Sequence, residues 1–220
     1  MYDIFRLKRE LRSSKTYGLA LDIDETLSFT AKYWVDKLSK KFGNPDNLSA
    51  REVLQKYILI QRYPHFRNQK ALNWMKRARS ENKIQEKLPL IENANHIVNK
   101  INKIVPIVCY LTIRPGNVIS GTQKWLDKHG FPKAPIITRP RSIRYTKGNQ
   151  WKAKALSFLY PQVLGIVDDS LYLIDHLPKS YKGTIFLYDY HKNHKKRKNL
   201  IYCKNWEDVL IKVSERFVWG

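Results

Sequence analysis

Residues 19–27 read Leu19-Ala-Leu-Asp22-Ile-Asp24-Glu-Thr26-Leu27, and this segment indicates the architecture of the whole chain. It starts as a continuous apolar run of strand length and ends with two carboxylates that are two residues apart. A continuous apolar run is typical of a strand covered on both faces of a parallel sheet. Ligands bind at the carboxyl ends of such strands, so both carboxylates can turn toward one pocket if the chain leaves as a loop. An acidic surface turn would use the same residue types, but the flanking apolar run and Thr-Leu pair favour a site.

The rest of the chain repeats the alternation of strand and helix. Apolar runs of strand length cover residues 17–23, 104–111, 134–138, 163–167 and 184–188. Helical apolar faces lie between or after them, at 91–101, 118–126 and 206–217. Asn205 is placed to cap the N-terminus of the helix at 206–217, with Asp208 at the third position of that helix. This order predicts an α/β fold, a Rossmann-like parallel sheet built from right-handed crossovers.

One segment interrupts the alternation after the first strand. Residues 30–88 read mostly as helix, with a stop at Gly43-Asn-Pro45 and a capping box at Ser49-Ala-Arg-Glu52. The segment holds 14 Lys/Arg against 5 Asp/Glu, an excess of +9. We therefore expect a core formed by residues 1–29 and 89–220, with a helical insertion at 30–88.

A hydroxyl group follows the second apolar run, in Val108-Cys-Tyr-Leu-Thr112-Ile-Arg114. At the same edge of the sheet, Thr112 could donate a hydrogen bond to a phosphoryl oxygen, and Arg114 would add positive charge for substrate binding. Threonine at the end of a strand is common, so this motif is weak by itself.

Adjacent acids, Asp168 and Asp169, end the fourth apolar run. Two neighbouring carboxylates repel each other and lose solvation on burial, so they favour a bound cation. Mg²⁺ prefers oxygen ligands and keeps several waters, which makes one or two carboxylates per strand end sufficient. Asp175 follows in the next helix, where a solvated acid is an equally good interpretation.

A cation is also needed to balance a phosphate and an anionic nucleophile. Three lysines lie before the Asp168 strand: Lys147, Lys152 and Lys154. Lys152 falls near the start of a helix, on the side next to its inward face, and we favour it, although the sequence leaves all three open.

Taken as a set, the order D-x-D-x-T, Thr112, Lys152 and Asp168-Asp169 resembles the haloacid dehalogenase (HAD) superfamily of phosphotransferases, over Leu19 to Asp169. The resemblance implies that Asp22 is the nucleophile and Asp24 the general acid/base, and that Thr112 and Lys152 hold the phosphoryl group. It implies a Mg²⁺ site formed by Asp22, Asp168 and the backbone carbonyl of Asp24. The insertion matches the family's helical cap.

One departure from the family pattern is that the acid expected a few residues after the aspartate pair is displaced. It leaves open which of Asp169 and Asp175 contributes to the metal site, and the candidate ligand is Asp169. Asp168-Asp169, the cap and Trp206-Glu-Asp look like the deoxyribonucleotidase-type 5′-nucleotidases. The helix at Thr122-Gln-Lys-Trp125 is also similar to the 3′-phosphatase half of phage polynucleotide kinases.

The amino-acid composition indicates which kinds of partner and compartment to expect. The chain of 220 residues carries 41 Lys/Arg against 19 Asp/Glu, a net charge of +22. Such a field attracts polyanions, so nucleic acid is a possible partner, although a general compositional bias toward lysine explains it equally well. The tract 191–198 is either a solvated loop or a phosphate contact patch. The sequence has no signal-peptide pattern and no apolar run long enough to span a bilayer, and its only cysteines are Cys109 and Cys203. We therefore expect a cytoplasmic protein with reduced cysteines and no membrane association.

The sequence thus predicts a Mg²⁺-dependent phosphate monoester hydrolase that acts through an aspartyl-phosphate on a nucleotide or another small phosphorylated metabolite. The alternatives are a polynucleotide 3′-phosphatase and a non-catalytic nucleic-acid-binding protein on a phosphatase scaffold.

Overall fold

A computed structural model describes residues 3–189 and 197–218. Its centre is a six-stranded, wholly parallel sheet in the order β3-β2-β1-β4-β5-β6. The strands are β1 (Gly18–Leu21), β2 (Ile107–Pro115), β3 (Ile136–Arg139), β4 (Val163–Asp168), β5 (Thr184–Tyr188) and β6 (Leu200–Cys203). The predicted α/β class with a Rossmann-like parallel sheet is confirmed.

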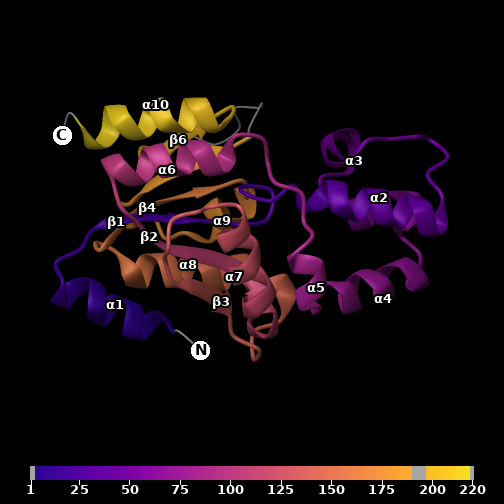
Figure 1. The fold of residues 1–220 in the computed structure, drawn as a ribbon, viewed down its shortest axis with the longest axis horizontal. Coiled ribbons are helices and arrows are strands. Elements are labelled where there is room, and N and C mark those ends of the chain that lie inside the picture. The colour runs from indigo at the N-terminus through magenta and orange to yellow at the C-terminus, as the bar shows by residue number, and fades with distance from the viewer. Residues whose placement is uncertain (1–2, 190–196, 219–220) are drawn as a thin grey trace.

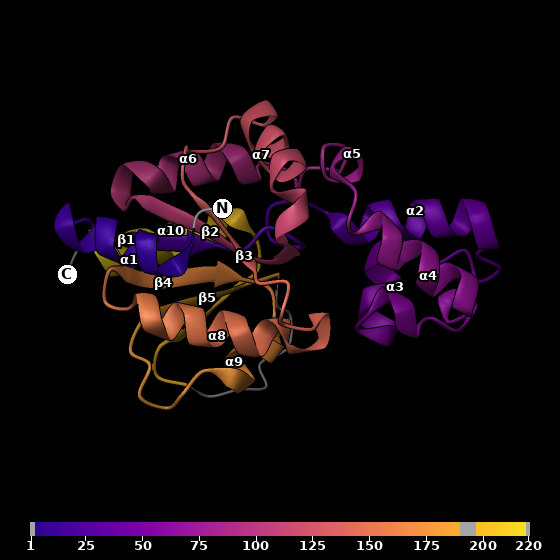
Figure 2. The same ribbon diagram turned by 90° about the horizontal axis from the view of Figure 1, so that it is seen from below.

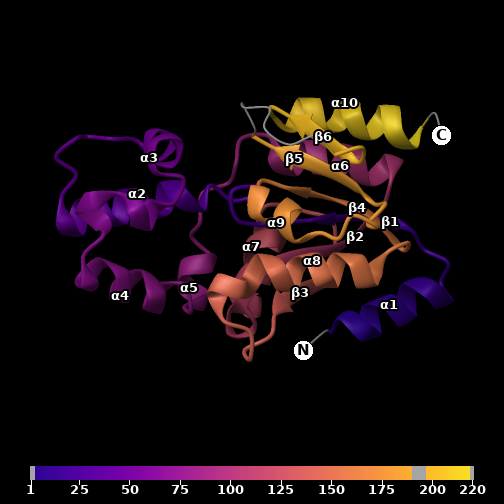
Figure 3. The ribbon, with the colours of Figure 1, turned by 180° about the vertical axis from the view of Figure 1, so that it is seen from behind.

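Helices cover both faces of this sheet, as Figures 1 and 3 show. One face carries α1 (Ile4–Ser13), α8 (Gly148–Leu159) and α9 (Leu171–His176). The other carries α6 (Ala94–Ile104), α7 (Ile119–Lys128) and α10 (Trp206–Phe217). Strand β1 divides its side chains between the two cores: Leu19 and Leu21 pack on the second face and Ala20 on the first. This two-sided burial explains why the apolar run of β1 is continuous.

The insertion lies between β1 and β2 and is helical, as predicted. It contains α2 (Thr30–Phe42), α3 (Ala50–Tyr57), α4 (Gln69–Ala78) and α5 (Asn82–Gln85), with the short 3₁₀ turns η1 (Ile60–Arg62) and η2 (Pro64–Phe66). Helices α2 to α4 have an apolar cluster of their own and lie to one side of the sheet, beyond the carboxyl ends of its strands (Figure 2). The bounds 30–88 stay a prediction.

Local signals in the sequence account for the ends of these helices. Gly43 ends α2 with a positive φ of 82°, a backbone conformation that suits glycine. The Ser49 side chain accepts a hydrogen bond from the Glu52 backbone and the Glu52 carboxylate accepts one from Ser49, which confirms the capping box. Asn205 caps α10 by accepting from the Asp208 backbone N–H, also as expected.

Three features differ from the sequence-based expectation or were missed by it. Strand β2 continues through Pro115, so Thr112 lies inside the strand, paired with Thr138, and not after its end. The edge strand β6 and the N-terminal helix α1 were not predicted. Two more 3₁₀ turns, η3 (Gly116–Val118) and η4 (Tyr145–Lys147), precede α7 and α8.

Among the described residues, every helix is too short or too polar to span a bilayer. Cys109 and Cys203 are buried free thiols, in agreement with the sequence-based expectation.

Candidate active site

The candidate site lies where the strand order reverses, between β1 and β4. Asp22 follows β1 directly, and its backbone N–H donates to the Val167 carbonyl over 2.9 Å, while Asp168 is the last residue of β4. In open parallel sheets, the crevice outside the carboxyl ends of the strands at such a reversal is where ligands bind. The topology therefore places the two acidic motifs, 146 residues apart, next to each other at the end of the core that faces the insertion (Figure 2).

Lys152 joins these two motifs. Its Nζ atom lies 2.5 Å from Asp22 Oδ1 and 2.5 Å from Asp168 Oδ2, and the lysine is 1% exposed. Burial alone would lower the pKa of Lys152, but the charges of Asp168 and Asp22 raise it above the usual value, so the amine is a cation. Among the three candidate lysines, Lys147 ends η4 and Lys154 is exposed on α8, which leaves Lys152 as the one in contact with both acids.

Three carboxylates gather at this point. Oxygen atoms of Asp22, Asp168 and Asp169 all lie within 4.8 Å of one another. Burial raises the pKa of Asp22 to about 7, with Lys152 opposing that shift, and burial together with the Asp168 charge raises the pKa of Asp169. Three carboxylates and one ammonium leave a charge of −2 when all are ionised, so an all-oxygen set with this charge fits Mg²⁺. Asp175 lies in α9 and is not part of this cluster.

Asp24 has a different environment, because a buried arginine holds it. Arg114 donates from Nε to Asp24 Oδ2 over 2.9 Å and from Nη2 to Asp24 Oδ1 over 2.7 Å. Thr30 donates to the same carboxylate over 2.6 Å. Although burial opposes it, the charge of Arg114 keeps the pKa of Asp24 below its ordinary value.

Arg114 was expected to bind substrate. In the structure its guanidinium donates hydrogen bonds to side chains of the protein itself. Beyond Asp24, its guanidinium donates to the hydroxyls of Thr122 and Ser28, each over 3.1 Å. Thr112, the predicted phosphoryl ligand, is fully buried, and its hydroxyl accepts from the Arg114 backbone N–H over 3.2 Å. The structure therefore brings Asp22, Lys152, Asp168 and Asp169 together, pairs Arg114 with Asp24, and leaves the predicted phosphoryl contacts of Thr112 and Arg114 as predictions.

The loop after β1 makes contacts that the sequence did not reveal. Glu25 adopts a positive φ of 59°, and its carboxylate accepts from the Ala31 N–H over 2.5 Å, near the start of α2. Burial raises the pKa of Glu25 to about 8. Trp206, at the start of α10, donates from its indole to the Thr26 carbonyl over 2.9 Å. Glu25 inside the acidic motif and the apolar face of Trp206 were visible in the sequence, but their partners depend on the fold.

One of the contacts between the insertion and the core pairs a cation with an aromatic ring. The Arg79 guanidinium, at the end of α4, lies 4.8 Å from the centroid of the Tyr145 ring in η4. Burial raises the pKa of Tyr145, and the negative charges of Asp24 and Asp22 add to the rise. The Arg79–Tyr145 contact therefore joins the insertion to the core.

Solved structures share this fold. A HAD hydrolase of family IA, variant 3, from Entamoeba histolytica has a TM-score of 0.54 and 17% identity, and the match covers 93% of this chain and 100% of that one. A HAD-superfamily hydrolase from Ehrlichia chaffeensis has a TM-score of 0.50 and 12% identity, with 90% and 96% covered. One of subfamily IA, variant 1, from Geobacter sulfurreducens has 0.50 and 13%, with 90% and 96% covered.

No protein-family model matches the chain, and no curated protein matches it significantly. The structural similarities nevertheless show that the chain has the fold of HAD-superfamily hydrolases, including a helical insert after β1, as the acidic motifs had indicated.

Proposed function

We propose that this protein is a Mg²⁺-dependent phosphatase that hydrolyses phosphate monoesters through an aspartyl-phosphate at Asp22. The observation that carries the proposal is the cluster of Asp22, Asp168 and Asp169 oxygens within 4.8 Å, with Lys152 between Asp22 and Asp168. The three carboxylates would hold Mg²⁺, with Asp24 contributing its backbone carbonyl. The bound ion would supply positive charge at the phosphoryl oxygens and favour the ionised form of Asp22.

The proposed reaction has two steps. A carboxylate oxygen of Asp22 attacks phosphorus in line, the bond to the ester oxygen breaks, and Asp24 donates a proton to that oxygen. Asp24 then removes a proton from water, the water oxygen attacks phosphorus, and orthophosphate leaves with Asp22 restored. Lys152 offsets the charge that develops on the phosphoryl oxygens, and Thr112 is proposed to donate a hydrogen bond to one of them.

The test is the Asp22→Asn variant with an aryl phosphate as substrate and Mg²⁺ in excess. We expect residual turnover below about 1% of wild type, because loss of a nucleophile costs several orders of magnitude. Asp36→Asn, an exposed change in α2, is the control and should keep full activity. Circular dichroism checks that the folds match. Turnover by Asp22→Asn above that limit would contradict the covalent mechanism.

A small phosphorylated metabolite such as a nucleotide is the substrate class that we propose, because an insertion positioned over a site tends to enclose it. The +9 excess in residues 30–88 favours the alternative, a polynucleotide 3′-phosphatase. Counterion release makes binding of a phosphate chain strongly salt-dependent. If a 3′-phosphorylated oligonucleotide is hydrolysed about tenfold better than a mononucleotide at low salt, with a steep salt dependence, the alternative replaces our proposal.

A further inference from the structure

The N-terminal helix α1 has two faces of different chemistry. Leu7 and Leu11 are buried in the apolar core on the sheet face that α8 and α9 also cover. Phe5, Lys8, Arg9 and Arg12 follow the spacing i, i+3, i+4, i+7, so they share another face of the helix. Across its length the helix carries four cations and one acid. A cationic and aromatic stripe therefore points away from the core.

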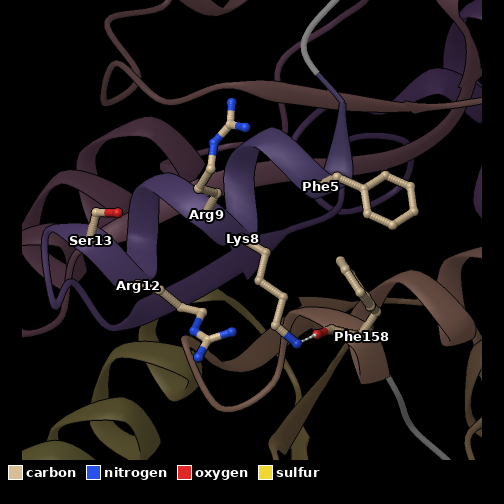
Figure 4. A pocket seen from close by; sticks show the side chains of 6 residues that line it. All are labelled: Phe5, Lys8, Arg9, Arg12, Ser13 and Phe158. Carbon is tan, nitrogen blue, oxygen red and sulfur yellow. Dashed lines mark hydrogen bonds between the residues drawn. The ribbon is translucent and has the colours of Figure 1, made fainter.

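This stripe borders a hollow of about 380 Å³, lined by Phe5, Lys8, Arg9, Arg12, Ser13 and Phe158. Figure 4 shows the Phe5 and Phe158 rings close together and the Lys8 amine donating to the Phe158 carbonyl. The two rings meet edge to face with centroids 5.1 Å apart, and Lys8 Nζ lies 4.3 Å from the Phe158 centroid. Phe5 is 70% exposed, so most of its side chain is accessible to a ligand.

The charges in this hollow are unbalanced. Arg9 and Arg12 form no ion pair with any residue of the described ranges, whereas the neighbouring Arg6 pairs with Glu10 over 2.8 Å. None of the six lining residues is acidic. Unpaired guanidinium groups beside an exposed aromatic ring match the two features that single-stranded nucleic acids offer, phosphates and base faces.

The hollow is also separate from the acidic cluster. Phe158 lies six residues beyond Lys152 on α8, about 9 Å along the helix axis, toward the end where β4 begins. An anionic membrane is a poorer partner, because the apolar face of α1 is buried in the core and cannot enter a bilayer.

We propose that the α1 stripe and Phe158 form a docking site for single-stranded nucleic acid, apart from the phosphatase site. Arg9 and Arg12 contact backbone phosphates, and Phe5 stacks on a base. The proposal does not depend on the proposed phosphatase function, because a strand without terminal phosphates would bind here as well.

The experiment measures fluorescence anisotropy of an internally labelled oligonucleotide with hydroxyl ends, so that the phosphatase site is not engaged. Arg9→Ala and Arg12→Ala are compared with Arg6→Ala, which makes the same charge change on the same helix. We expect each of the first two to weaken binding at least threefold and Arg6→Ala to change it less than twofold. Together, Arg9→Ala and Arg12→Ala should flatten the slope of log K against log salt by about 1.4, at about 0.7 per phosphate contact.

Phe5→Ala separates stacking from charge. The ring is exposed, so the variant should fold, weaken binding at least fivefold, and keep the salt slope of wild type. Equal losses in Arg6→Ala and Arg9→Ala would show that binding follows net charge alone and would overturn the proposal. So would an unaffected Phe5→Ala variant, tighter binding of a duplex, or a defect confined to vesicles containing phosphatidylserine.

Discussion

Arg114 and Asp24, 90 residues apart in sequence, form a two-point ion pair in which the arginine is 5% and the aspartate 29% exposed at the side chain. The pair restrains the residue proposed as general acid/base and favours its ionised form. An ionised Asp24 is ready to accept a proton from water, the second step of the proposed reaction. The first step needs the same residue protonated, so Arg114 sets the balance between the two steps.

We expect Arg114→Gln to act through Asp24. Losing one partner of a buried pair costs about 3–5 kcal/mol, and because Asp24 is partly exposed we expect about 2–3 kcal/mol at pH 7. The pKa of Asp24 is depressed in the folded state, so its contribution is present above its unfolded value, near pH 4, and disappears as the pH falls through the folded value. The difference between variant and wild type in urea unfolding should therefore shrink toward pH 3.

The pH–rate profile offers a second measurement for Arg114→Gln. The acidic limb of kcat should move to higher pH, because the pKa of Asp24 rises when the arginine is removed. A rise in KM without a shifted limb would instead support the substrate-binding role that the sequence suggested for Arg114. An unfolding difference that is the same at pH 3 and pH 7 would mean that packing and not charge is responsible.

Lys152 and Lys154 offer a matched pair of lysines on α8. Lys152→Ala removes the cation between Asp22 and Asp168 and leaves both carboxylates buried, so we expect a loss of about 3 kcal/mol or more in the free energy of unfolding. We also expect kcat to fall by about a hundredfold or more, as for removal of a charge-stabilising group. Lys154→Ala, an exposed change, should stay within twofold of wild type. Equal kcat values for the two variants would refute the proposed role of Lys152.

Asp169 and Asp175 offer a matched pair of aspartates for testing the metal site, since only Asp169 belongs to the carboxylate cluster. Mg²⁺ that binds only the folded protein should raise the unfolding temperature, by an amount that follows its concentration. Asp169→Asn removes one negative charge from the cluster and should weaken the apparent Mg²⁺ affinity about tenfold, whereas Asp175→Asn should leave it unchanged. This thermal titration needs no substrate. A larger effect of Asp175→Asn would assign the displaced acid of the family pattern to α9.

How far the sequence predicted these features depends on the range of the interactions involved. The strands and the acidic ends of β1 and β4 were predictable, since burial on both faces gives a continuous apolar run and a parallel sheet gathers its carboxyl ends at one edge. Lys152 was favoured from helix phase alone. The edge strand β6 and helix α1 were missed because each has few fully buried side chains: one in β6 and two in α1.

Which side chains contact each other was harder to predict than the strands and helices. The pairing of Arg114 with Asp24 depends on how β2 continues past Thr112, where its register with β3 shifts, and no local pattern encodes that shift. The Trp206 contact with Thr26 spans 180 residues in the same way. Of the basic tract 191–198, residues 191–196 lie outside the described residues. Arg197, which is described, donates to the carbonyls of Leu177 and Pro178, which indicates a structural role for that arginine.

Arg79 and Tyr145 provide the last prediction, because their contact connects the insertion with the core. A cation over an aromatic ring at a partly exposed site contributes about 0.5–1 kcal/mol, equivalent to about 2- to 5-fold in an equilibrium constant. If this contact favours closure of the insertion over the site, Arg79→Ala and Tyr145→Ala should each raise KM for an aryl phosphate by that factor. The double variant should be no worse than either single one, since both remove the same contact.

Tyr145→Phe keeps the ring and should resemble wild type, and Lys76→Ala, exposed on the same helix α4, is the charge-matched control. Fully additive single effects would show that Arg79 and Tyr145 act independently. A Tyr145→Phe variant as impaired as Tyr145→Ala would show that the hydroxyl, not the ring, matters.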